Sequence, residues 1–406
     1  MLFGGVLTLV VVVVAAFAVI PVMRHAGFPP AAATVLVGIA VGGMAPHADQ
    51  IMLTPAVLGI FLPALIFESA WNLDAHVLRR VAFAVLFLAV PGVALTALAV
   101  GGMATLAGIG WGAALVLGAI LSATDPVAVL ALFRPLGLPL DLLTLVEGES
   151  IANDGVAVVL VQAAIPLALA GTWPNAIALT TSLLGIAFGG MFVGIALAAL
   201  AAPLLRRRSH WSVHVAITLV VAYGSYALAS HFGWSGIFAS AAAGIALPAS
   251  ALGPRDAAIV DRFWDRIALL ANVVVFALVG LSLQLERVLH EPLLIAATFA
   301  GVFLSRGLIA YLVTLLDPHM PRAWAWHHAI ALAGLRGGLP IALALGLPAA
   351  FPQRPQVIDA VFSVVFVTLV VQGWLLGPLA RRLDFGSARS TAQHERRIDP
   401  AKPARV

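Results

Sequence analysis

The sequence predicts an all-α polytopic membrane protein. Of its 406 residues, 62% are hydrophobic and only 10% are charged, and the mean hydropathy is +1.06. Average soluble domains carry about 25% charged residues, so this chain has far more apolar surface than a soluble domain needs. Apolar runs also recur along almost the whole chain, each near the roughly 20 residues that a helix needs to cross a bilayer.

Thirteen apolar segments can be separated, with ends defined to within about 2–4 residues. They cover residues 3–23, 29–46, 50–72, 81–105, 110–133, 142–170, 176–204, 212–231, 234–252, 263–285, 291–316, 323–349 and 356–380. The first run follows no basic segment, so we expect it to be a retained span rather than a cleaved signal peptide.

The distribution of basic residues supports this odd number of crossings. With the N-terminus outside, 18 of the 22 Lys and Arg residues fall on the cytoplasmic side, and Arg287 and Arg354 fall outside. This bias follows the positive-inside rule. The pI of about 10.3 thus indicates membrane topology and contact with lipids rather than nucleic-acid binding. We expect residues 381–406 to form a short, basic, disordered cytoplasmic tail.

Two of the spans are predicted to be interrupted. Span 110–133 contains Thr124-Asp125-Pro126, where the proline removes a backbone donor in mid-helix. Span 323–349 contains Gly334-Leu335-Arg336-Gly337-Gly338-Leu339-Pro340. The spans are seven apart and therefore run in opposite directions. Interrupted helices in such inverted positions are typical of the midplane site of a transporter, although Pro and Gly also produce ordinary kinks.

Carboxylates cluster beside the first interruption. Span 142–170 enters from the cytoplasm, and at 1.5 Å per residue Asp154 lies roughly 18 Å along it, near the bilayer centre. Ser150 and Asp154 share one helical face, and Glu149 and Asn153 share the adjoining face. Carboxylates at this depth cost several kcal/mol each and mark functional positions.

These groups are hard oxygen ligands, with no sulfur or imidazole nearby, and this suits an alkali cation. An interruption at Thr124 would free carbonyl oxygens that complete the ligand shell. A buried site that holds either a proton or a cation is the minimal device for antiport. The hypothesis is therefore exchange of H⁺ for a monovalent cation at Asp154; the alternative is that Asp154 pairs with an intramembrane arginine.

The charged neighbours have structural alternatives. Glu149 either binds the cation or forms a fixed ion pair with Arg336, which would neutralise two buried charges. Asp125 is expected to offset the N-terminus of the half-helix that follows it, with Arg306 available to balance its charge.

Two further polar residues complete the candidate set. Asn153 is expected to hydrogen-bond across the interruption near Thr124. Glu68 lies near the cytoplasmic end of the third span, where it either lines an access funnel or is an interfacial carboxylate. With no cysteine in the chain, thiolate metal sites and disulfides are excluded, and no cofactor is expected.

The sequence resembles a known family in its motifs. The pattern is Ser-Ala-Thr124-Asp125-Pro126 followed by Gly148-Glu149-Ser150-x-x-Asn153-Asp154-Gly155. Further matches are Leu62-Pro-Ala-Leu-Ile-Phe-Glu68-Ser-Ala, Ser235-Gly236-Ile237, Ala271-Asn272, Leu278-Val-Gly280 and Gly334-Leu335-Arg336-Gly337. These are similar to bacterial NhaP-type sodium/proton antiporters, in the cation:proton antiporter subfamily that includes the eukaryotic sodium/proton exchangers.

The resemblance implies about thirteen helices in two inverted six-helix repeats, with the two interrupted helices crossing. It implies one antiporter domain over 1–380 and a homodimer in the bacterial inner membrane that works by an elevator movement. The mobile core would be about 81–170 and 291–380, and the dimerisation scaffold about 1–80 and 176–285.

The resemblance also assigns residue roles. Na⁺ (or Li⁺) would be held by Asp154, Ser150, Glu149 and the main chain at Thr124, and Asn153 would stabilise the crossing. Arg336 would pair with Glu149. Because Asn153 stands where the electrogenic branch has an aspartate, exchange would be electroneutral, one cation per H⁺. One departure is Gly338-Leu339-Pro340, where family members often carry Ala-Val after Arg-Gly, so the second interruption could be shifted.

Other functions lack the features they require. A channel or uniporter needs a selectivity filter, and the sequence contains no repeated carbonyl loop of that kind. A serine protease would need a final glycine after Gly148-Glu149-Ser150-Ile151 and a histidine partner, and an aspartyl protease would need its own flanking motifs. Whether Na⁺ or K⁺ is transported stays open, because the two ions use the same ligand types.

Overall fold

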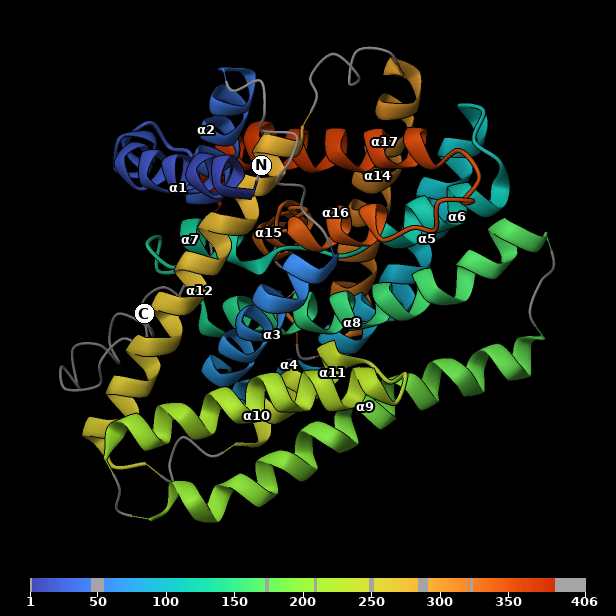
Figure 1. Cartoon of the computed structure of the whole chain (residues 1–406). Helices are drawn as coiled ribbons and strands as arrows, with labels where there is room; N and C mark the ends of the chain where they lie inside the picture. Colours follow the sequence, from blue (N-terminus) through green and yellow to red (C-terminus); the bar gives the residue numbers. More distant parts are fainter. Residues whose placement is uncertain are drawn as a thin grey trace.

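The structure is a computed structural model that describes residues 2–44, 55–171, 175–207, 210–247, 252–283, 291–318, 320–321 and 324–383. Within these residues every regular element is a helix, which confirms the all-α fold class (Figure 1). The first half comprises α1 (Leu2–His25), α2 (Pro30–Met44), α3 (Pro55–Asn72), α4 (Ala75–Ala89), α5 (Pro91–Leu106), α6 (Trp111–Ile120), α7 (Pro126–Phe133) and α8 (Leu140–Ala170).

The second half comprises α9 (Ala176–Leu205), α10 (Trp211–His231), α11 (Gly236–Ala246), α12 (Pro254–Ser282), α14 (Pro292–Leu316), α15 (Trp324–Leu332), α16 (Gly338–Leu345), α17 (Arg354–Val367), the π-helical turn η3 (Thr368–Gln372) and α18 (Gly373–Arg382). In Figure 1, α9 and α10 lie along one edge of the molecule, and α1 and α17 lie towards the opposite edge.

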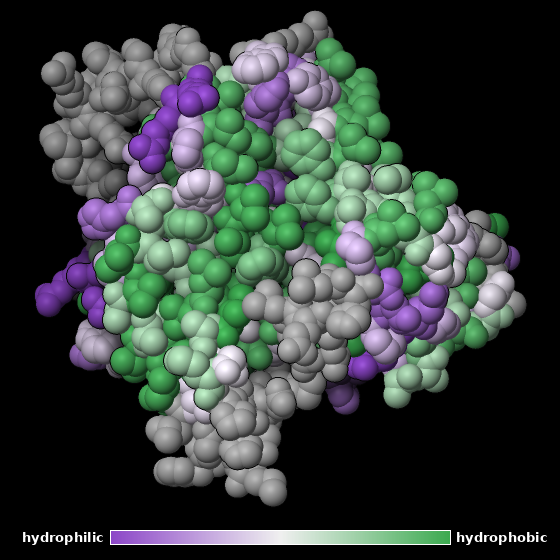
Figure 2. All heavy atoms as spheres, turned by 90° about the horizontal axis from the view of Figure 1, so that it is seen from above, coloured by the Kyte–Doolittle hydropathy of each residue, from purple (hydrophilic) through white to green (hydrophobic). Residues whose placement is uncertain are grey.

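Eight helical stretches among the described residues are long and apolar enough to cross a membrane. They are Thr8–His25, Ala75–Leu106, Leu140–Ala170, Thr180–Leu205, Trp211–His231, Pro254–Ser282, Pro292–Leu316 and Arg354–Arg382. Helices α2, α6 and α11 are apolar but shorter. The chain is a multi-pass membrane protein, and each of the thirteen expected segments overlaps at least one helix. On the face drawn in Figure 2, apolar side chains cover most of the described surface.

Several ends differ from the predicted ones because hydropathy does not detect polar helical turns. The span expected at 81–105 begins at Ala75, where the Asp74 carboxylate caps α4 by accepting from His76 N at 2.8 Å. It bends at Pro91, the first residue of α5. Arg381 and Arg382, assigned to the tail, end α18. Arg287 and residues 384–406 lie outside the described residues.

The start of helix α12 also differs from the predicted one: the helix begins at Pro254, whereas the apolar segment was expected to begin near residue 263. Its first turns carry charges of both signs, so they form a polar extension of an otherwise apolar helix. Helices α2 and α12 then cross at two glycines. A Cβ on Gly280 would lie 2.3 Å from the Val35 carbonyl oxygen, and one on Gly38 would lie 2.6 Å from that of Ala277. Only glycine permits this close approach of two backbones.

The two predicted interruptions are present, and they meet. Residues 121–125 separate α6 from α7, and residues 333–337 separate α15 from α16. The Asp125 backbone N–H donates to the Leu335 carbonyl at 2.8 Å. Gly337 also packs against Asp125, because a Cβ there would lie 2.7 Å from the Asp125 Cβ. Pro340 lies in the first turn of α16, where a missing N–H costs nothing, so it does not displace the interruption.

Candidate functional site

Asp125 stands at the start of the half-helix α7. Its backbone is extended, and its Oδ1 accepts from Val127 N at 2.9 Å, so the carboxylate caps the helix as the sequence predicted. Pro126, the next residue, favours a helix start. The second oxygen, Oδ2, is buried and has no hydrogen-bond partner among the described residues. Because buried polar atoms are nearly always paired, this free oxygen marks a position for a bound group.

Asp154 lies midway along the continuous helix α8. Its Oδ1 is also buried without a hydrogen-bond partner in the described part of the chain. Asp125 and Arg336 act on its carboxylate electrostatically. The first interruption and helix α8 therefore place Asp125 and Asp154 near each other, and each carboxylate has an oxygen that can accept a proton or coordinate a cation.

A hydrogen-bond network joins α8 to the first interruption. Thr124 Oγ1 and Ser150 Oγ lie 2.9 Å apart, and Asn153 Nδ2 donates to Thr124 Oγ1 at 3.3 Å. The second bond is the contact across the interruption that the sequence predicted for Asn153. The same amide donates to Glu149 Oε1 at 2.8 Å. The network holds residues 121–125 against α8 and so sets the position of Asp154 relative to Asp125.

The expected partner of Glu149 was wrong. Glu149 is 1% exposed and forms a two-pronged ion pair with Arg306 on α14, in which Arg306 Nη1 binds Oε1 and Nη2 lies 2.8 Å from Oε2. Arg306 Nε donates to the Ile330 carbonyl at 3.0 Å. The sequence analysis left Arg306 available to balance the charge of Asp125, but its guanidinium is engaged by Glu149 instead. The pairing depends on how α14 is rotated against α8.

Arg336 has a different role from the predicted one. Its Nη1 donates to the carbonyls of Ser122 and Ala123, each at 3.1 Å, and its backbone N–H donates to Thr368 Oγ1 at 3.3 Å. The guanidinium, 1% exposed, thus satisfies carbonyls that the first interruption leaves without helical partners. It binds the two interruptions to each other, and the direct ion pair of Glu149 is with Arg306, so that Glu149 acts on Arg336 only through its charge.

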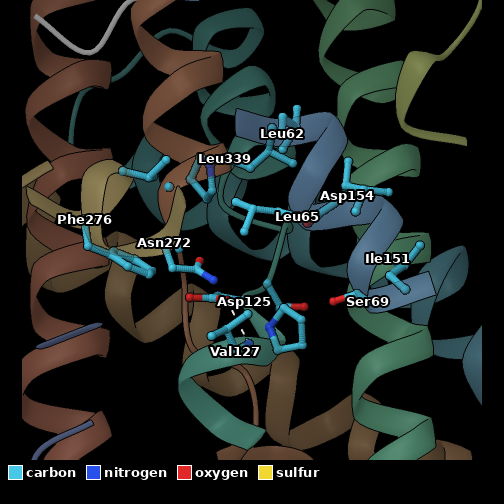
Figure 3. A pocket seen from close by; sticks show the side chains of 17 residues that line it. Leu62, Leu65, Ser69, Asp125, Val127, Ile151, Asp154, Asn272, Phe276 and Leu339 are labelled. Atoms are coloured by element: carbon cyan, nitrogen blue, oxygen red, sulfur yellow. Dashed lines mark hydrogen bonds between the residues drawn. The ribbon is translucent and has the colours of Figure 1, made fainter. Parts of the chain in front are cut away.

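A cavity of about 70 Å³ opens at this crossing (Figure 3). Among the predicted site residues, Thr124, Asp125 and Asp154 line it, whereas Glu149, Ser150 and Asn153 do not. Its remaining lining residues are Leu62, Leu65, Ile66, Ser69, Pro126, Val127, Ile151, Asn272, Val275, Phe276, Gly337, Gly338, Leu339 and Pro340. The described residues contain no cluster of three or more His, Asp or Glu side chains that could hold a metal ion.

Two polar residues of the cavity wall were not predicted as site residues. Ser69 on α3 and Asn272 on α12 both occur in the matched motifs, but no role was assigned to them. In an almost wholly apolar helix, the sequence does not show which face meets a cavity. A polar residue in an apolar run was the available signal.

Glu68 does not line the cavity, although its neighbour Ser69 does. Its Oε1 accepts from Asn72 Nδ2 at 2.7 Å. Electrostatically it interacts with Glu147, Arg134 and Asp265. Arg134 in turn pairs with Glu147 at 3.5 Å. Glu68 therefore belongs to a charged group beside the site, partly buried among α3, α8 and α12 rather than free at an interface.

Crossed helix interruptions around unpaired carboxylates, inside a multi-pass membrane protein, define a secondary transporter rather than an enzyme. Residues 12–382 match the family model described as "Sodium/hydrogen exchanger, transmembrane". The chain belongs to the sodium/hydrogen exchanger family.

Named relatives agree with this membership. The chain is 36% identical over 340 residues to the Na(+)/H(+) antiporter ApNhaP of Aphanothece halophytica, covering 80% of this chain and 64% of that protein. It is 33% identical over 346 residues to the Na(+)/H(+) antiporter NhaP of Pseudomonas aeruginosa, covering 80% of each. Its fold is similar to that of the sodium proton antiporter MjNhaP1 from Methanocaldococcus jannaschii, with a TM-score of 0.75, 22% identity, and coverage of 94% of this chain and 99% of that one.

Proposed function

We propose that this protein exchanges Na⁺ or Li⁺ for H⁺, one for one, across the bacterial inner membrane. The observation that carries the proposal is the pair of free carboxylate oxygens, Asp125 Oδ2 and Asp154 Oδ1, at a cavity between two crossed interruptions. A carboxylate there binds either a proton or a cation, and the two compete. Family membership and the names of the relatives support sodium as the cation.

Asp154 is the proposed carrier of the proton and of the cation. The main chain at Thr124, which lines the cavity, supplies a second ligand. Ser150 either contacts the ion directly after a small movement or acts through its 2.9 Å contact with Thr124 Oγ1. Glu149 is not proposed as a direct ligand, because both its oxygens are engaged by Arg306.

The proposed one-for-one stoichiometry follows from the fixed charges around Asp154. The charge of Glu149 is compensated by Arg306, and Asn153 carries no charge. Asp125 caps the half-helix α7 through Oδ1, and we propose that it keeps one charge state throughout the cycle. One carboxylate is then left to change its state in each cycle, so exchange moves no net charge.

Alternating access is proposed to come from an elevator movement within a homodimer. The moving part would be about 81–170 and 291–380, extended to Ala75 by the observed start of α4. Because residues 75–80 then move with α4, the scaffold would be about 1–74 and 176–285, with the N-terminus outside and the C-terminus in the cytoplasm. In support, the cavity has residues of both parts in its wall, with α3 and α12 from the scaffold. A movement between the parts would therefore open and close it.

The test uses purified protein in liposomes with an imposed pH gradient and an internal pH dye. Sodium, lithium, potassium or choline is added in turn, with and without a clamped membrane potential. We expect sodium and lithium to collapse the gradient equally well with and without the clamp. Collapse by potassium at the same concentrations would identify a potassium/proton antiporter instead. Intact protein that responds to no cation would refute antiport and leave a channel or uniporter as the alternative.

A further inference from the structure

The cavity at the crossing has two chemically different walls. One wall comes from the interruptions and α8, and it contributes Thr124, Asp125 and Asp154. The other wall comes from α3 and α12, and it is apolar at Leu62, Leu65, Ile66, Val275 and Phe276. The polar side chains of this second wall are Ser69 on α3 and Asn272 on α12.

Neither polar group is needed to hold the fold together. No hydrogen bond joins the Ser69 hydroxyl or the Asn272 amide to another described residue, and neither group is among the fully buried atoms that lack a partner. Ser69 is 5% exposed as a residue, and both polar groups border the cavity, so an ion or a water there can supply the partner that buried polar groups normally have. The two neutral polar groups thus share the cavity with two carboxylates that each have one free oxygen, and a single occupant could bind all of them.

Figure 3 shows how these groups are placed. Asn272 reaches from α12 to one side of Asp125, and Ser69 on α3 lies on the other side, near Ile151 and Asp154. Phe276, one turn after Asn272, packs at the apolar end of the same wall. The polar ends of the second wall thus face the carboxylates, and apolar side chains surround them.

We infer that Ser69 Oγ and Asn272 Oδ1 are specificity-determining ligands, which complete the oxygen shell of the cation held by Asp154, directly or through one water. The inference rests on the proposed function. Carboxylates attract any small cation, whereas neutral oxygens replace its water and so discriminate between ions of different size. A cavity of about 70 Å³ has room for an ion and a few waters, which fits a partly hydrated ion.

This arrangement also couples binding to movement. Ser69 and Asn272 lie on the proposed scaffold, and Asp154 lies on the proposed moving part. When the two parts shift, the cation loses its neutral ligands but keeps its carboxylate. Binding is then strongest in the state that has both walls in contact, and weaker when the site is displaced from α3 and α12.

The test compares Ser69→Ala, Asn272→Ala and the double variant with wild type in the liposome assay, at alkaline pH, where protons compete least. Each single change should raise the KM for sodium by about tenfold, as expected for loss of one contact to a charged group. The maximal rate should stay near that of wild type, and the preference for sodium over potassium should fall. Asn272→Ser and Ser69→Thr, which keep an oxygen, should restore part of the affinity.

Matched controls come from residues outside the cavity. Ser225→Ala removes a buried hydroxyl that donates to the Ala222 carbonyl, and Asn175→Ala removes the cap of α9. Both should keep the wild-type KM. Sodium binding to purified protein, measured by calorimetry, should be weakened in Ser69→Ala and Asn272→Ala to the same degree as the KM is raised.

The outcomes separate this inference from the proposed function. A wild-type protein that exchanges no cation refutes the proposed function itself. Wild-type exchange together with unchanged KM and ion preference in both alanine variants overturns the inference alone. A shifted pH profile with unchanged sodium affinity also overturns it, because that result would mean that Asn272 donates to Asp125 instead. If a variant fails to transport, calorimetry decides: wild-type affinity contradicts the inference, and weakened affinity supports it.

Discussion

At the scale of single residues, the decisive feature is which carboxylates have a partner. Glu149 and Asp154 lie five positions apart on the same helix, yet Glu149 is neutralised by Arg306 and Asp154 has a free buried oxygen. A buried charge without a fixed partner is costly unless a proton or a cation neutralises it. The difference between the two residues thus assigns transport to one and structure to the other.

Asp154→Asn should abolish exchange while leaving the fold intact. An amide has almost the same shape but takes up no proton and binds a cation far more weakly. We would measure sodium-driven collapse of the pH gradient in liposomes and check the folded state by size-exclusion chromatography. Asp141→Asn, on the same helix and paired with the exposed Arg80, is the matched control and should keep the wild-type rate. A wild-type rate in Asp154→Asn would overturn the mechanism.

Arg306→Ala should destabilise the protein strongly. It leaves Glu149 buried and unpaired, at a cost of about 3–5 kcal/mol. The change would be followed by thermal unfolding in detergent, with Arg80→Ala as control, because the exposed Arg80–Asp141 pair is worth at most about 1 kcal/mol. In the double variant Glu149→Gln/Arg306→Gln, the loss should be less than the sum of the single losses. Equal melting temperatures for Arg306→Ala and wild type would contradict the ion pair's structural role.

Arg336→Ala should lower both stability and turnover. The reason is the loss of two hydrogen bonds to backbone carbonyls, and not the loss of an ion pair with Glu149. The change leaves the carbonyls of Ser122 and Ala123 without their donor, at a cost of about 1–3 kcal/mol for each. Because those carbonyls precede Thr124, the ligand geometry loosens as well. Thermal unfolding and the liposome assay would report the two effects. Unchanged unfolding would show that other donors replace the guanidinium.

At the scale of helices, close packing of two backbones fixes the position of a helix that lines the cavity. Helix α12 brings Asn272 to the cavity, and it is held against α2 at Gly38 and Gly280. Leu278-Val-Gly280 was noticed in the sequence only as a family match. The structure supplies its physical reason, which is that a side chain there would collide with the backbone of α2.

Gly280→Ala should therefore destabilise the protein by about 1–3 kcal/mol, because the added Cβ would lie 2.3 Å from the Val35 carbonyl oxygen and force the helices apart. Gly224→Ala on α10 is the matched control: nothing lies within 4 Å of its Cβ position, so the better helix propensity of alanine should leave stability equal or higher. Melting temperatures in detergent would measure both. Equal values for Gly280→Ala and Gly224→Ala would argue against tight α2–α12 packing.

Local features of the site could be predicted from the sequence, and tertiary ones could not. The Asp125 cap follows from an Asp-Pro pair at a helix start, and the Asn153–Thr124 contact follows from two adjacent motifs. The partner of Glu149 was missed because Arg306 and Arg336 are both intramembrane arginines, and choosing between them requires the rotation of α14 against α8. Ser69 and Asn272 were missed because apolar helices do not reveal which face meets a cavity.

At the scale of the whole molecule, electroneutral exchange depends on how many groups titrate as the cation binds. The described membrane-spanning part places Asp125 and Asp154 at one cavity. If both took up protons, two protons would compete with each cation and exchange would move charge. We propose that Asp125, as the cap of α7, keeps one charge state while the cation binds, so that one proton competes with one cation.

This argument yields a prediction for pH dependence. As pH falls, the protonated fraction of Asp154 rises, so the KM for sodium should increase while the rate at saturating sodium is retained. For one competing proton the KM rises about tenfold per pH unit in the range where the site is mostly protonated, and for two protons about a hundredfold.

The measurement is the KM for sodium across a pH series in liposomes, compared with Asp125→Asn. Asparagine caps a helix as well as aspartate does, so this variant keeps α7 capped and removes only the second charge. Its KM should be higher at every pH, because one attractive charge is lost, but the dependence on pH should have the same slope as in wild type. A steeper wild-type slope that Asp125→Asn reduces would mean that both carboxylates titrate, and it would contradict one-for-one exchange.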